Sequence, residues 1–117
     1  DSIISDFSQE EILESYVNNP HARTAIGQLS NGHWIFLVVD GKKSFFFRNT
    51  GITISNLANL MKSIGCVAAL NLDGGGSSTM VLENRVVNTP CGEKRDREGK
   101  WIRPVSNALL VMPKTKF

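Results

Sequence analysis

Metal-binding residues are scarce in this sequence, which has only two cysteines and two histidines. A structural zinc site needs about four such ligands at characteristic spacings, and these residues lie far apart in the chain: His21, His33, Cys66 and Cys91. The sequence therefore predicts no zinc site. The two cysteines allow one disulfide or two free thiols, so they leave the cellular compartment open. Cys66 lies in an apolar stretch, where a buried free thiol is the commoner outcome.

A strong charge of one sign is also absent, because 13 lysines and arginines face 11 acidic residues, for a net charge of +2. Such a weak and mixed charge disfavours nucleic acid as a partner. No apolar run is long enough to cross a membrane, since the run 66–72 is broken by Asp73. The first residues do not form a signal peptide, and the lack of an Asn-X-Ser/Thr acceptor argues against a glycosylated secretory protein.

The most informative stretch is 69–81, in which an apolar run ends in Asp73 and three glycines and three hydroxyl residues follow. Its short apolar flanks predict a strand, a tight loop and a second strand. Glycines let a ligand approach the main chain closely, and successive backbone N–H groups in such a loop can bind an anion. Asp73 beside these donors fits acid–base or nucleophilic chemistry on a phosphorylated or glycosidic substrate.

The same stretch has a simpler interpretation, because Asp-Gly is a turn dipeptide and a glycine run also forms hairpin turns. Three known motifs do not fit it. The stretch lacks the Gly-Lys-Ser/Thr ending of a P-loop, the last glycine of a nucleophile elbow and the dinucleotide fingerprint. On these residues alone, a plain turn and a ligand-binding loop are about equally favoured.

The sequence as a whole predicts one small α+β domain, with a mixed, mostly antiparallel sheet and about two helices. Ser8 with Glu11 predicts the start of a first helix, which ends before Pro20. Thr53 and Gly65 enclose a second helix, whose apolar stripe should cover one face of the sheet.

Strands are expected over five segments: 21–29, 33–40, 67–72, 79–88 (as a hairpin) and 108–112. The Asn31-Gly32 turn joins the first two, and 33–40 is expected to be central because both of its faces are apolar. The polar segment 91–100 is expected to be an exposed loop with solvated charges. The aromatic run 44–48 fits either the core or the lip of a sugar-binding pocket.

Three motifs follow one another in the chain: 23–27 (RTAIG), 70–79 (LNLDGGGSST) and 103–109 (RPVSNAL). Together they resemble the phosphodiester glycosidase family, and the intervening helix and hairpin have the same order. The likeness covers 21–112. Three motifs in register are more specific than one glycine run, so the resemblance favours the ligand-binding interpretation of the central loop.

The resemblance implies hydrolysis of a sugar-1-phosphodiester, of the N-acetylglucosamine-1-phosphate diester type, to free sugar and a phosphomonoester. Asp73 would be the catalytic carboxylate, and Arg23 and Arg103 would hold the phosphate. Thr24 and Asn107 would orient sugar hydroxyls or the acid. Backbone N–H groups and hydroxyls of the loop would bind phosphodiester oxygens: Gly74, Gly75, Gly76, Ser77 and Ser78. No cofactor is predicted, and a divalent metal stays open.

Family domains are longer and extend before the arginine motif. The resemblance therefore implies that residues 1–117 are the C-terminal part of one domain, with 1–20 as an N-terminal helical segment and 21–112 as the family-like region. Another chain or segment would complete it and supply the second carboxylate that glycoside cleavage usually employs, since Glu83 is expected at a solvent-facing turn. The alternatives are a non-catalytic module that binds a phospho-sugar or polysaccharide, and a structural domain whose loop is only a turn.

Overall fold

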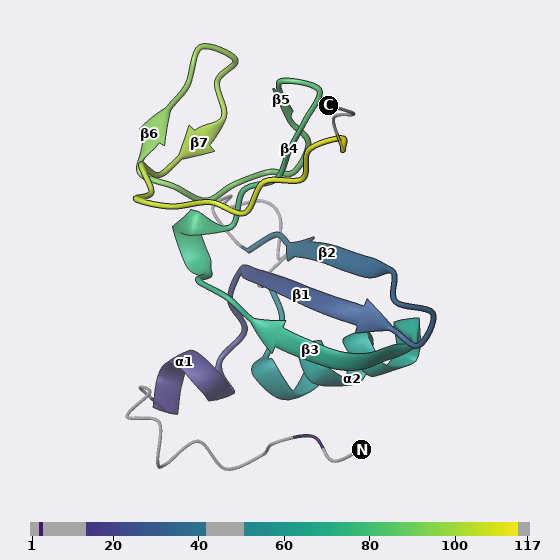
Figure 1. The fold of residues 1–117 in the computed structure, drawn as a ribbon. Coiled ribbons are helices and arrows are strands. Elements are labelled where there is room, and N and C mark those ends of the chain that lie inside the picture. Colours follow the sequence, from purple (N-terminus) through teal and green to yellow (C-terminus); the bar gives the residue numbers. More distant parts are fainter. Residues whose placement is uncertain (1–2, 4–13, 42–50, 115–117) are drawn as a thin grey trace.

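The computed structural model describes residues 3, 14–41 and 51–114, and a three-stranded antiparallel sheet forms its centre (Figure 1). The strands lie in the order β2-β1-β3: β1 (Arg23–Leu29), β2 (Trp34–Val39) and β3 (Cys66–Asn71). β1 and β2 form the expected hairpin, in which Gly32 has a φ of +86°. Together with two α-helices in the described residues, this sheet confirms the predicted α+β class.

Helix α2 (Ile54–Ile64) lies along one face of the sheet (Figure 1). Its ends are those that the sequence predicts. Thr53 Oγ1 accepts the Asn56 N–H at 3.2 Å, and Gly65 closes the helix in the left-handed conformation with a φ of +104°. The core under this helix consists of buried Ala25, Leu57 and Met61, surrounded by half-buried Ile35, Leu37, Val39, Ile52 and Cys66. The predicted apolar stripe therefore covers one face of the sheet.

The opposite face of the sheet is apolar and largely exposed. Ile26 pairs with both Phe36 and Leu70, so these three side chains share this face. Phe36 and Leu70 are 41% and 61% exposed, and Trp34 on the same face is 58% exposed. We call Ile26, Trp34, Phe36 and Leu70 the open sheet face. The prediction that 33–40 is a central strand is wrong, because β1 is central and β2 lies at an edge.

Helix α1 (Glu14–Asn18) precedes β1 and ends before Pro20, as predicted. The predicted helix start at Ser8 and Glu11 and the aromatic run 44–48 lie outside the described residues. Among the residues that the structure describes, no helix has the length and apolar character needed to cross a membrane.

Short elements follow the sheet: the 3₁₀ turn η2 (Gly75–Ser77), β4 (Val81–Leu82), β5 (Arg85–Val86), β6 (Lys94–Arg95) and β7 (Trp101–Ile102). β4 and β5 form the predicted hairpin, with Glu83 and Asn84 at positive φ. The predicted exposed loop over 91–100 is wrong only at β6, which pairs with β7; the rest of this range is turn or irregular structure and mostly exposed. The Asp96 carboxylate stabilises their turn by accepting the backbone N–H groups of Glu98 and Lys100 at 2.9 and 2.7 Å.

The predicted strand over 108–112 is also wrong. None of the described strands pairs with this segment, and a strand needs a neighbour for its backbone hydrogen bonds. Its apolar side chains are 59–79% exposed: Leu109, Leu110, Val111 and Met112. Cys66 and Cys91 are half-buried and form no disulfide with each other in this structure.

Candidate active site at the glycine turn

The glycine-rich loop begins where β3 leads into η2. Leu72 N–H donates to the Thr24 carbonyl and Gly75 N–H to the Ala22 carbonyl, each at 2.8 Å. These bonds hold the loop against the start of β1 beyond the end of β3. Gly75 has a φ of +61°, which glycine adopts without the steric cost of a Cβ. The loop is therefore a defined turn fixed to the central strand.

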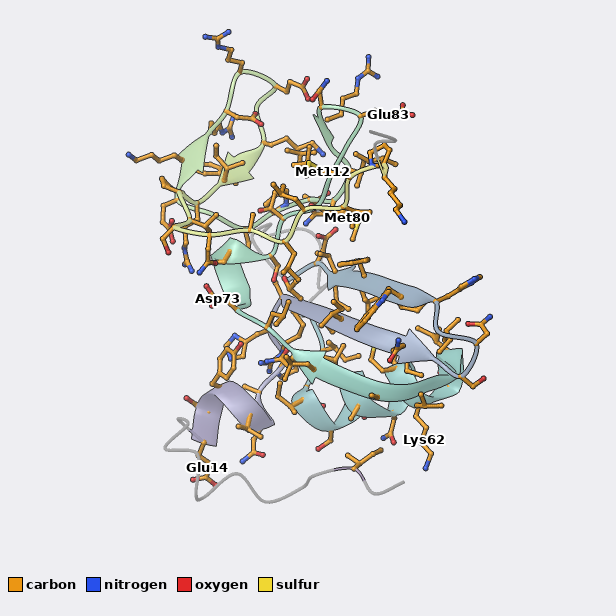
Figure 2. The ribbon with its side chains drawn as sticks, in the orientation of Figure 1. Glu14, Lys62, Asp73, Met80, Glu83 and Met112 are labelled. Carbon is orange, nitrogen blue, oxygen red and sulfur yellow. The ribbon has the colours of Figure 1, made fainter. Side chains whose placement is uncertain are left out.

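Asp73 lies at the junction of β3 and η2, as Figure 2 shows. Its side chain is exposed, and Oδ1 accepts the Gly74 N–H at 2.9 Å. That bond restrains the carboxylate by its own backbone and leaves Oδ2 to solvent or a ligand. The predicted catalytic carboxylate is thus accessible and locally ordered.

Arg103 reaches the same turn from the segment after β7. An ideal Cβ built at Gly76 would lie 2.8 Å from both Cζ and Nη2 of Arg103, so the guanidinium lies directly against this glycine. Arg103 Nη1 donates to Ser77 Oγ at 3.3 Å. The side chain is 39% exposed. Of the two arginines expected to hold phosphate, Arg103 is the one at the surface of the loop.

Glu93, which the sequence analysis treated as a solvated charge, is paired with Arg103. Its Oε1 accepts from Nε at 3.0 Å and from Nη2 at 2.7 Å. This hydrogen bond is the main cause that raises the pKa of Arg103, with further contributions from the charges of Glu93 and Asp73. No spacing rule indicated Glu93, because the β6–β7 hairpin brings it to the loop.

The inner side of the loop is held by other side chains. Ser78 is 1% exposed, and its Oγ accepts a hydrogen bond from Thr24 Oγ1 at 3.1 Å. Asn88 Oδ1 accepts the Met80 N–H at 2.8 Å, and Asn88 Nδ2 donates to the Ser78 carbonyl and to Asp40 Oδ1, both at 2.9 Å. Asn88 and Asp40 carry no signal of this role in the sequence, because they look like ordinary residues at the ends of strands.

Arg23 has no exposed surface. Its Nε donates to the Ile52 carbonyl at 2.9 Å, and Nη2 donates to the Tyr16 and Asn19 carbonyls at 2.6 and 3.0 Å. Its guanidinium also lies over the Tyr16 ring, 4.5 Å from the centroid. Nη1 is buried without a hydrogen-bond partner in the structure. In this conformation Arg23 joins α1 to the sheet, and its role in holding phosphate stays a prediction.

Two further residues, Asn107 and Glu83, are exposed. Asn107 is exposed, and within the described segments no hydrogen bond joins it to the loop. Glu83 is exposed at the tip of the β4–β5 hairpin, well away from Asp73 (Figure 2). Glu83 is therefore the solvent-facing acid that the sequence predicts.

The surface of the turn combines an accessible carboxylate, a guanidinium and a hydroxyl. Guanidinium groups bind phosphate oxygens in bidentate geometry, and a positioned carboxylate can accept a proton or attack carbon. In the described ranges, no three acidic, histidine or cysteine side chains are grouped so as to hold a metal ion. This arrangement suits a phosphorylated ligand with a reacting bond next to its phosphate.

Comparison with known proteins supports this chemistry. A family model described as phosphodiester glycosidase matches residues 3–112. The chain belongs to the phosphodiester glycosidase family. The matched range includes all three motifs, so the resemblance drawn from them is confirmed.

Two relatives of this phosphodiester glycosidase chain show how much of a whole protein it spans. It is 34% identical to the N-acetylglucosamine-1-phosphodiester alpha-N-acetylglucosaminidase of Bos taurus over 96 residues, or 82% of this chain and 18% of that protein. It is 42% identical over 72 residues to YomE, an uncharacterized SPbeta prophage-derived protein of Bacillus subtilis, covering 62% of this chain and 11% of that protein. The chain thus spans less than a fifth of either relative.

Solved structures are also similar to this chain over only a part of their own length. The zebrafish N-acetylglucosamine-1-phosphodiester alpha-N-acetylglucosaminidase catalytic domain, auto-inhibited by its pro-peptide, is similar at a TM-score of 0.60 and 32% identity. The match covers 76% of this chain and 27% of that chain. A hypothetical protein from Synechocystis, with a TM-score of 0.65 at 22% identity over 76% of this chain and 16% of its own, supports the fold alone. The zebrafish catalytic domain therefore extends far beyond the matched part.

Proposed function

We propose that this chain carries part of the active site of a phosphodiester glycosidase that hydrolyses a sugar-1-phosphodiester to free sugar and a phosphomonoester. The observation that carries the proposal is the placement of Asp73, Arg103 and Ser77 around one glycine turn. Family membership supports the reaction class. The name of the bovine relative makes an N-acetylglucosamine-1-phosphodiester the first substrate to test.

In this proposal Arg103 binds the phosphate, with Ser77 beside it. Hydrolysis breaks the bond between the sugar C1 and the phosphodiester oxygen and forms a bond from a water oxygen to C1. The phosphomonoester leaves with the electron pair of the broken bond, and Asp73 accepts the proton of the attacking water. Because a phosphate is already a good leaving group, the reaction demands less of a general acid.

The other predicted site residues support this centre. Gly74 and Gly76 let the turn pack closely, since a Cβ would lie 2.7 Å from the Ala22 carbonyl oxygen at the first and 2.8 Å from the Arg103 guanidinium at the second. Phosphate contacts by the backbone of Gly74, Gly75 and Gly76 stay a prediction. Thr24 and Ser78 hold its inner side, and Arg23 holds α1 beneath it. A sugar contact by Asn107 stays a prediction.

We also propose that a segment of the family domain outside these 117 residues covers the open sheet face and completes the site. Exposed apolar surfaces of this kind mark interaction sites. The chain spans 11% of YomE and 27% of the zebrafish catalytic domain, which supports a larger domain as the source of that segment. Such a segment is a reasonable source of the second carboxylate that glycosidases usually employ.

The test is release of free sugar from an N-acetylglucosamine-1-phosphodiester by a longer chain that carries the complete family domain, as wild type and as Asp73→Asn. We expect the variant to lose at least about a hundredfold in turnover, because the amide cannot accept the proton. Glu83→Gln is the matched control, since it removes an exposed carboxylate away from the turn. Circular dichroism checks that each variant is folded. Equal turnover by wild type and Asp73→Asn would refute the role of Asp73.

One observation favours a second function, a phospho-sugar-binding module without catalysis. Arg103 and Ser77 form a contact at the surface of the turn that suits phosphate binding by itself, without a contribution from Asp73. A wild-type chain that binds the phosphodiester, loses this binding on Arg103→Ala and releases no sugar would select the binding module.

A further inference from the structure

Glu93 and Arg103 are placed at the two open ends of one hairpin. Glu93 immediately precedes β6, and Arg103 immediately follows β7. The Gly92 N–H donates to the Trp101 carbonyl at 3.1 Å, which closes the base of the hairpin beneath the pair. Figure 1 shows this base next to the η2 turn. The pairing is therefore built into the hairpin, and it is presented to the candidate site.

The contacts with Glu93 use only one edge of the guanidinium, formed by Nε and Nη2. Glu93 Oε1 accepts from Nε and Nη2, which is the side edge of the group. Nη1 points to Ser77 Oγ at the turn. The edge formed by Nη1 and the second N–H of Nη2 has no carboxylate in these contacts, and its shape matches two oxygens of a phosphate. One arginine can in this way hold Glu93 and a phosphate together.

We propose that Glu93 is a positioning residue that holds Arg103 flat against Gly76, with its remaining edge directed at the phosphate of the substrate. This inference rests on the proposed function for the identity of the ligand. Without Glu93, the half-exposed Arg103 side chain would sample many rotamers. Phosphate binding would then have to fix one of them, and the lost conformational entropy would weaken the binding. The pair is exposed, with 39% and 58% of the two side chains accessible, so its effect on fold stability is small.

In the opposite role, Glu93 would compete with phosphate for Arg103, and the Glu93→Gln substitution would change the phosphate affinity in the opposite direction. Removing a competitor would strengthen phosphate binding, whereas removing a positioning residue weakens it. Removing the charge of Glu93 also lessens repulsion of phosphate, so weaker binding in Glu93→Gln would be direct support for positioning. Glu98→Gln is the matched control, because Glu98 is an exposed acid in the turn of the same hairpin.

The experiment measures the Kd of inorganic phosphate, and the KM and kcat of an N-acetylglucosamine-1-phosphodiester, for wild type, Glu93→Gln, Glu93→Asp and Glu98→Gln. We expect Glu93→Gln to raise the Kd and KM about tenfold while kcat changes less than about twofold. Glu93→Asp should recover part of the loss because it keeps a carboxylate, and Glu98→Gln should match wild type. Urea unfolding should show no difference in stability between the chains.

Tighter phosphate binding by Glu93→Gln would overturn the inference and make Glu93 a competitor. A fall in kcat at constant KM would overturn it in favour of proton transfer by Glu93. Unchanged binding, or a wild-type chain that binds no phosphate, would also overturn it. If wild type releases no sugar but binds phosphate in a Glu93-dependent way, the proposed hydrolysis fails while the positioning role stands.

Discussion

At residue 76, the lack of a Cβ lets the Arg103 guanidinium lie against the turn. In Gly76→Ala the new methyl would lie 2.8 Å from Arg103 Cζ, and the flexible arginine rather than the backbone would move. We expect phosphate to bind about tenfold more weakly, since Arg103 loses its orientation. The free energy of unfolding should change by less than about 1 kcal/mol, measured by urea denaturation.

Gly75→Ala is the control for this residue. A Cβ at Gly75 meets no atom within 4 Å, but the φ of +61° is unfavourable for alanine. This variant should lose about 1 kcal/mol of stability with little change in phosphate binding. Equal loss of binding in both variants would show that the turn is simply fragile and that contact with Arg103 is not the cause.

Single residues were predictable from the sequence where their chemistry is local. Asp73 and its glycines stand next to one another, so an exposed acid at a tight turn could be inferred directly. Glu93 could not, because its partner Arg103 is supplied by a hairpin that the sequence analysis took for a loop. The burial of Arg23 was equally hidden, since its acceptors come from α1 and from Ile52, which are separate in the chain.

Among the elements, α2 carries the core, and Leu57 is its most direct test. Leu57 is 3% exposed and packs with Ala25 and Met61 under the sheet. Leu57→Ala should therefore cost about 2–5 kcal/mol of unfolding free energy by lost burial and a residual cavity. Asn59→Ala on the exposed side of the same helix should stay within about 0.5 kcal/mol of wild type. Similar values for the two variants would mean that α2 does not pack as described.

Elements whose ends are marked by local signals were predicted well. Thr53 and Gly65 cap α2 through contacts within a few residues. The Asn31-Gly32 dipeptide is sufficient by itself to predict the turn between β1 and β2. Strand order and pairing were less predictable, because they depend on which other strands are present. The apolar pattern of 33–40 suggested a central strand and that of 108–112 a further one, yet among the described strands neither segment has the neighbours that this would require.

For the whole molecule, these two errors have a common physical explanation. Both segments carry apolar side chains that the described core does not bury. Trp34 is 58% exposed and Leu110 is 79% exposed. Apolar surface is expected to be buried when a suitable partner surface exists. The apolar patterns of both segments suit a larger sheet, which is consistent with the proposed completing segment. A larger sheet would also explain why these patterns predicted a strand order that the described residues do not have.

The open sheet face allows the completing segment to be tested with Trp34 as a probe. The 117 residues contain two tryptophans, so Trp101→Phe leaves Trp34 as their single tryptophan emitter, and any tryptophan in the added segment of the longer chain is also replaced by Phe. In the 117-residue chain, its emission should be typical of a solvent-exposed indole and acrylamide should quench it readily. In a longer chain that carries the complete family domain, we expect a blue shift and weaker quenching, because the added segment would bury this face. Leu57→Ala destabilises the core without touching this face, so it controls for general loosening of the fold. A Trp34 that is equally quenched in both chains would show that the segment packs elsewhere and that the open sheet face serves another contact.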